Sequence, residues 1–495
     1  MEINLKKMPF LLCAAVVLLL GACQLDKVEK FDGGKFWVAD FSKANQPVYS
    51  INATKLFEGQ ECIIYTGNGS GVTKIDAERY AKKFDNSIYD MMVRYFCQEN
   101  ITENSVTYAN TLKYSYSLVK NQDKLIILMM DIKDTYTGNK GDGYVAGYFD
   151  PTDFYELSNS NYKSMIYVDT DPGLRDEEKM FETFIHELQH LINYVTSMRV
   201  RPNNSSRIPN RMDTWIDEGL SAMAEYLYRT DSFSRPGMPD KDRIAWFNED
   251  PKKTISQGNN FFIWDNYQSV DNAILDEYAT VHMFFYWLFF QANEDAALLK
   301  KIISSGKSNY QALTENTAAV ISGGGDWETL LRTWMAANYL NAGNGAYGYK
   351  NKPEFSNIKV KAIKTENDKI LLYPGEGVYS VMNSEFAASQ DDSGENIRYA
   401  GLKKPNTVNA SAPLYSGDFL LTFNKNTTGK IQENGYLTGE EPPSETPIKA
   451  AVGGRFVSDN SSPMIIDAQD LMRKRRGDTL ILPEAYEALR TAHEN

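Results

Sequence analysis

The order of apolar and polar residues divides the chain into a mixed first part, a helical middle and a strand-rich end. Short apolar runs at 61–65, 125–131 and 165–169 predict buried strands. Between the first two runs, apolar residues recur at helical spacing from 75 to 98, which predicts a helix. We therefore expect the first part of the chain to be a mixed α/β region.

The middle of the chain is expected to be mostly helical. An apolar helical pattern covers about 180–197, and after a polar loop a second helix begins at Asp213 or Thr214, either of which can cap it, and runs to about residue 228. Further helical patterns occupy about 271–291, 294–304 and 327–340. The apolar run 281–290 is too short to span a bilayer, so we interpret it as part of a buried core helix.

Glycines mark a change of pattern after the helical part, at Gly343, Gly345 and Gly348. Beyond them, short apolar runs at 369–373, 377–381 and 418–423 predict strands. A proline-containing stretch at 439–447 predicts an exposed loop. The whole pattern indicates an α+β fold with a strand-rich C-terminal region.

The first 23 residues have the pattern of an export signal and not of a spanning helix. Lys6 and Lys7 precede an apolar stretch, and small residues stand directly before Cys23. This order resembles the bacterial lipobox, in which the signal is cut before the cysteine and the cysteine is lipidated. We therefore predict a membrane anchor at Cys23, at the outer membrane or cell surface of a bacterium. The alternative is an ordinary signal peptide with an incidental cysteine.

Composition narrows the possible functions. The 495 residues carry a formal net charge of −13, which argues against nucleic-acid binding because that function needs a basic surface. Hydrophobic residues make up 42% of the chain, enough for folded cores, and nothing indicates the oligomeric state. After signal cleavage and lipidation only Cys62 and Cys97 remain, and they either form one disulfide or stay buried and unpaired.

A possible metal site lies in the first helix of the middle part. The segment 186–190 reads His-Glu-Leu-Gln-His, so that one helical turn separates His186 from His190 and both imidazoles lie on one face. Such a pair supplies two nitrogen ligands to zinc, and Glu187 beside them can take a proton from a metal-bound water. The chain has only 4 histidines, which makes a chance match of this motif rare.

A catalytic zinc site needs a third protein ligand. A metzincin pattern is excluded, because Asn193 and Thr196 stand where a further histidine would be expected. Glu218 lies near the start of the second helix, whose positive end favours an ionised carboxylate. Asp217 and Glu225 compete for the same role, but Glu225 lies two turns further on and fits better as a partner that orients a ligating histidine.

The setting of Glu218, in Trp215-Ile-Asp-Glu-Gly219, resembles the gluzincin pattern of HExxH followed by a downstream glutamate. Together with Gly147-Tyr-Phe-Asp-Pro151 and the string HELQHLIN, it looks most like the hyicolysin-like bacterial metallopeptidases, over about residues 125–340. The resemblance implies a zincin-type core, Zn²⁺ held by His186, His190 and Glu218, and Glu187 as general base and acid. Ala222, where thermolysin-like relatives have an acid, departs from the pattern.

The resemblance also implies a donor that stabilises the oxyanion formed during peptide hydrolysis. Tyr278 and His282 are the alternatives, and we prefer Tyr278 because it lies at the polar end of its helix. Gluzincin aminopeptidases carry a Gly-x-Met-Glu-Asn motif that is missing before His186, which favours an endopeptidase acting on protein or peptide substrates. The alternative function is a lipid-anchored glycan- or protein-binding scaffold with a non-catalytic zincin-like domain.

These interpretations divide the chain into five expected segments. They are a signal peptide at 1–22, a lipid-anchored tether at 23–35, an N-terminal mixed part of the peptidase unit at 36–175, a helical zinc-binding part at 176–342 and a β-rich C-terminal domain at 343–495.

Three further features have a weaker connection to function. The strand before the zinc helix, within 163–169, would bind an extended substrate if it formed a sheet edge, although a core role is more common. The arginine-bearing loop 199–211 and the basic cluster 473–476 are interpreted as solvated charge.

Overall fold

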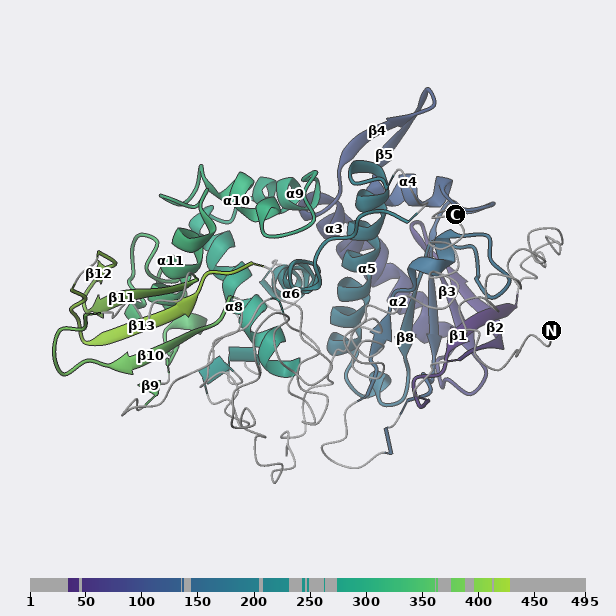
Figure 1. Ribbon diagram of the computed structural model, residues 1–495. Helices are drawn as coiled ribbons and strands as arrows, with labels where there is room; N and C mark the ends of the chain where they lie inside the picture. The colour runs from purple at the N-terminus through teal and green to yellow at the C-terminus, as the bar shows by residue number, and fades with distance from the viewer. Residues whose placement is uncertain are drawn as a thin grey trace, which may run out of the picture.

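A computed structural model describes most of the chain between residues 34 and 427 (Figure 1). The gaps in this range are 44–46, 135, 138–143, 204–207, 231–242, 245–246, 249–261, 263–273, 361, 364–374, 388–395 and 412–413. The predicted anchor at Cys23, the strand at 369–373, the loop at 439–447 and the basic cluster at 473–476 lie outside the described residues. The division into five segments therefore stays a prediction.

A six-stranded sheet forms the first part of the structure, in the order β1-β2-β3-β6-β8-β7. The strands are β1 Lys35–Ala39, β2 Val48–Glu58, β3 Cys62–Gly67, β6 Leu125–Met130, β7 Gly147–Tyr148 and β8 Met165–Asp169. The central strands β3, β6 and β8 are parallel, and the others pair antiparallel. Parallel strands are covered on both faces, which explains why the predicted apolar runs coincide with them.

The strand within 163–169 is not at the edge of the sheet, because β7 pairs with β8 on its outer side. Tyr148 of β7 lies in register with Tyr167 of β8, and the two rings stack with their centroids 4.0 Å apart. The less common alternative, an exposed edge at 163–169, is therefore excluded, and the expected core role is confirmed. Two residues of β7 are too few for a hydrophobic pattern, and for this reason the sequence did not predict this strand.

The helical pattern at 75–98 is confirmed, but it is divided. Helix α2, Lys74–Lys83, continues through a π-helical turn, Phe84–Ile88, into α3, Tyr89–Tyr95. A hairpin of β4, Glu99–Glu103, and β5, Val106–Asn110, follows and projects from the body of the molecule (Figure 1). Most of its side chains are exposed, so no apolar pattern predicted it.

The five helices predicted for the middle part are present, and two short helices, α4 and α10, were not predicted. The helices are α5 Glu177–Val200, α6 Thr214–Thr230, α8 Ile274–Gln291, α9 Ala296–Ile303, α10 Gln311–Thr317 and α11 Trp327–Leu340, with α4 Thr111–Ser117 before them. Short 3-10 turns cover Pro151–Phe154, Gly173–Arg175 and Pro353–Phe355. Among the described residues, no helix is both long enough and apolar enough to cross a membrane.

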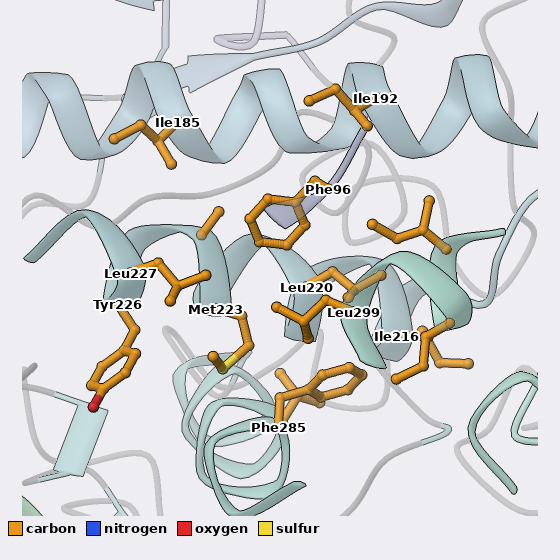
Figure 2. Packing of buried hydrophobic residues seen from close by; sticks show 14 of the residues in the cluster. Phe96, Ile185, Ile192, Ile216, Leu220, Met223, Tyr226, Leu227, Phe285 and Leu299 are labelled. Atoms are coloured by element: carbon orange, nitrogen blue, oxygen red, sulfur yellow. The ribbon is translucent and has the colours of Figure 1, made fainter. Parts of the chain in front are cut away.

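Three of these helices, α5, α6 and α8, stack on the sheet in that order. Helix α5 packs against β8, α6 against α5, and α8 against α6. Figure 2 shows the apolar side chains that fill the space between them, among them Ile185 and Ile192 of α5, Met223 of α6 and Phe285 of α8. This stack brings helices distant in sequence into one core.

A second sheet lies on the other side of the helices (Figure 1), in the order β12-β11-β13-β10-β9. Its strands are β9 Ala362–Ile363, β10 Gly377–Val381, β11 Ile397–Lys403, β12 Thr407–Asn409 and β13 Phe419–Asn424. The hydroxyl of Tyr379 donates a hydrogen bond of 2.7 Å to the carbonyl oxygen of Met335 in α11. The strands predicted at 377–381 and 418–423 are confirmed.

The sequence does not decide whether Cys62 and Cys97 pair. In the structure both are buried and form no disulfide. Burial raises the pKa of Cys97 to about 12. Both thiols therefore pack as small apolar groups in the first core.

Helix α6 packs closely against α8 at Gly219, where a Cβ atom would overlap the ring of Phe285. Replacing Gly by Ala inside a helix normally stabilises by about 1 kcal/mol, whereas overpacking costs about 1–3 kcal/mol. We expect the overlap to prevail, so that Gly219→Ala lowers the free energy of unfolding by about 1–2 kcal/mol in urea denaturation. Gly306→Ala is the control, since nothing lies within 4 Å of its Cβ position. Equal stability of the two variants would contradict the close packing.

Candidate metal centre

Helix α5 carries the two histidines into the core. Its N-cap is Asp176, whose side chain accepts hydrogen bonds from the backbone N–H groups of Glu178 and Lys179. The helix is buried continuously from 180 to 197, so that both His186 and His190 are shielded from solvent. Their rings lie 4.7 Å apart, as expected for neighbours on one helix face.

Helix α6 brings Glu218 to the two histidines. Nε2 of His186 lies 3.3 Å from one carboxylate oxygen of Glu218, and Nε2 of His190 lies 3.7 Å from the other. One ligand atom from each of the three residues lies within 4.8 Å of the other two, and all three side chains are buried. Two ligand atoms ~2.1 Å from one ion in tetrahedral geometry are ~3.4 Å apart, which is close to the two Nε2–carboxylate distances.

The remaining ring nitrogen of each histidine lies next to a carboxylate. Nδ1 of His186 is 2.7 Å from Glu225, and Nδ1 of His190 is 3.0 Å from Asp217. A carboxylate at Nδ1 holds the proton there and leaves the lone pair on Nε2. Nε2 of His186 is buried and makes no hydrogen bond within the described residues, as expected for an atom that would bind a metal.

The carboxylate of Glu225 lies between two arginines. Arg243 donates hydrogen bonds of 2.9 and 3.0 Å to its two oxygens, and Arg229 approaches one of them at 3.4 Å. Burial alone would raise the pKa of Glu225, but the charge of Arg243 and the hydrogen bond to His186 outweigh it and hold this pKa well below its usual value. Glu225 therefore remains ionised beside His186.

Asp217 has a similar set of partners on the His190 side. Burial would raise its pKa, but His190 and the side-chain amide of Asn193, which donates a hydrogen bond of 2.5 Å, lower it overall. Arg201 donates a longer hydrogen bond of 3.4 Å to Asn193. The sequence suggests Asp217 as a competing ligand, whereas in the structure it lies at Nδ1 of His190.

The interpretation of the loop 199–211 as solvated charge is wrong for Arg201, which is buried. Its guanidinium is buried and donates hydrogen bonds of 2.9 and 2.6 Å to the carbonyl oxygens of Ile303 and Ser305. It connects the end of α5 to the segment after α9. Its pKa falls to about 10 because burial disfavours the charge.

Glu187 lies beneath the edge strand of the first sheet. It is fully buried, and a Cβ atom on Gly147 of β7 would stand 3.1 Å from Cγ of Glu187 and 2.5 Å from Cγ2 of Thr183. Glycine at this position leaves the space that the glutamate occupies. The motif that begins at Gly147 therefore contacts the residue predicted to be the general base.

Tyr278 and His282 of α8 both lie against Arg243. Nδ1 of His282 is 3.4 Å from a guanidinium nitrogen of Arg243, and the guanidinium carbon is 5.9 Å from the centroid of the Tyr278 ring. Both side chains are buried. The arginine that they contact is the one that pairs with Glu225. A role for either one as oxyanion donor stays a prediction.

Two arginines near the candidate metal ligands were not predicted from the sequence. Arg229 lies one turn after Glu225 on α6, a spacing that predicts an ion pair on a helix and could have suggested it. Arg243 lies in a polar stretch without a clear period, and only the packing of α6 beside α8 shows its position. No local signal could have indicated it.

A buried set of two histidines and a glutamate in an α+β fold is compatible with a metallopeptidase. The neutral metalloprotease ShpI of Staphylococcus hyicus is 23% identical to this chain over 301 residues. The match covers 59% of this chain and 60% of that protein, so the chain spans less than two thirds of its relative's length. No protein-family model matches the chain. The similarity supports a place in a metallopeptidase family.

Proposed function

We propose that this protein is a zinc-dependent endopeptidase of the gluzincin kind, related to the hyicolysin-like enzymes, with a zincin-type core. The observation that carries the proposal is the convergence of His186, His190 and Glu218 in one buried group, with Glu187 on the same helix. The donor set of two imidazoles and one carboxylate is common in catalytic zinc sites. The similarity to a metalloprotease supports the same assignment.

Zinc at this position would supply a water of lowered pKa and polarise the carbonyl of the scissile bond. Glu187 then accepts the proton of the attacking water, whose oxygen forms the new bond to the carbonyl carbon. The same carboxyl group gives the proton to the amide nitrogen as the C–N bond breaks, and the amine leaves. Tyr278 and His282 remain the alternatives for the donor to the oxyanion.

The last strand of the first sheet, β7, lies next to Glu187. Within the described residues, β7 ends the first sheet, and Gly147 of this strand packs against Glu187. A substrate backbone can add to such an edge through main-chain hydrogen bonds. We therefore assign substrate alignment to β7 instead of β8.

Glu187→Gln tests the catalytic role. Gln keeps the shape of the side chain but cannot accept the proton, so we expect peptide hydrolysis to fall on the order of 10³-fold while about one zinc per chain is retained. The measurement is zinc content and cleavage of casein or a broad peptide library by the full chain in detergent.

Glu178→Gln is the control for this experiment, because Glu178 lies on the same helix and its carboxylate accepts a hydrogen bond from Tyr228 outside the metal centre. It should cleave at the wild-type rate. Full activity of Glu187→Gln would contradict the proposed role. Zinc binding by the wild-type chain without any cleavage would favour the alternative function, a binding scaffold.

We also propose that the chain is held in the bacterial envelope by a lipid on Cys23. The support is the order of charged, apolar and small residues before this cysteine. Cys23→Ser should remove the lipid, so that the protein moves from the detergent phase to the aqueous phase in Triton X-114 partitioning of expressing cells. A variant that stays in the detergent phase, and still takes up labelled palmitate as the wild type does, would refute the assignment.

A further inference from the structure

Four charged side chains are buried together on the Nδ1 side of His186, opposite the Nε2 atom that faces Glu218. They are Glu182 of α5, Glu225 and Arg229 of α6, and Arg243 from the segment between α6 and α8, each at most 7% exposed. The set holds two carboxylates and two guanidinium groups, and the partly exposed Lys179 also contacts Glu182 at 3.2 Å. Burying such groups is costly unless each is paired, so the arrangement needs a physical explanation.

The two arginines have different partners. Arg229 holds Glu182 with two hydrogen bonds of 2.6 and 2.7 Å and reaches Glu225 only at 3.4 Å. Arg243 instead contacts both oxygens of Glu225, at 2.9 and 3.0 Å. The two-pronged contact of a guanidinium fixes the plane of a carboxylate, which a single contact does not.

The orientation of Glu225 matters because the same carboxylate lies 2.7 Å from Nδ1 of His186. The oxygen that faces His186 also accepts the 3.0 Å hydrogen bond from Arg243. Arg243 is itself enclosed by α8, through His282 at 3.4 Å and the ring of Tyr278. A continuous chain of contacts therefore runs from α8 to a candidate metal ligand.

We propose that Arg243 is a positioning residue for the metal: it holds Glu225 so that His186 keeps its proton on Nδ1 and directs the lone pair of Nε2 toward Glu218 and His190. The inference rests on the proposed zinc site. Arg243 would then affect metal affinity through Glu225, without being a metal ligand itself. Loss of such outer contacts typically weakens metal binding 10–100-fold.

Arg243→Lys and Arg229→Lys, in the full chain in detergent, separate this role from a purely structural one. Both replacements keep the charge and lose a two-pronged contact in the same buried group. Zinc affinity is measured by competition with a chromophoric chelator, and the stability of the metal-free protein by thermal unfolding. The visible absorption bands of the Co²⁺-loaded protein report the ligand geometry.

We expect Arg243→Lys to weaken zinc binding 10–100-fold and to change the Co²⁺ bands. Arg229→Lys should lower the stability of the metal-free protein by a similar amount but leave zinc affinity within about threefold of wild type, because its main partner is Glu182.

Wild-type zinc affinity in folded Arg243→Lys would overturn the inference and leave the proposed function intact. An equal loss in both variants would also overturn it, since the effect would then follow stability alone. A wild-type chain that binds no zinc would overturn the proposed function together with this inference. If Arg243→Lys does not fold, Arg243→Gln, which leaves Glu225 in place, is measured instead. The inference then requires at least a tenfold weaker affinity, and unchanged affinity would refute it.

Discussion

The burial of charge around His186 and His190 is the constraint on which the rest of the structure depends. A carboxylate or guanidinium inside a core is tolerated only when it is paired. Here Glu225 is paired with Arg243, and Asp217 with His190 and Asn193. Each pairing joins different segments of the chain, so these charged groups find their partners only in the folded core.

The helical stack provides the precision that this assembly needs. Helix α5 supplies two imidazoles on one face, and α6 must come close enough for Glu218 to reach both. Two glycines allow close packing on the outer sides of this helix pair: Gly219 lets α6 approach α8, and Gly147 leaves room for Glu187 beneath β7. At either position a larger side chain would require its neighbours to move.

Local patterns predicted the parts of the molecule that depend on local physics. The buried parallel strands and the long helices appeared as apolar runs and helical periods, and HExxH placed two histidines one turn apart. The structure brings Glu218 and Glu225 to these histidines, but their roles remain proposals. Strand β7 was too short to show a pattern, and the β4–β5 hairpin is too exposed. Arg243 depends on the packing of α6 and α8, which no sequence window contains.

Anomalous diffraction from crystals grown with zinc, recorded on both sides of the zinc absorption edge, tests the central claim most directly. The account predicts one strong zinc peak per chain between Nε2 of His186, Nε2 of His190 and the carboxylate of Glu218, with Glu187 beside it but not bound. A zinc peak elsewhere, with none between these three side chains, would contradict the proposed metal centre.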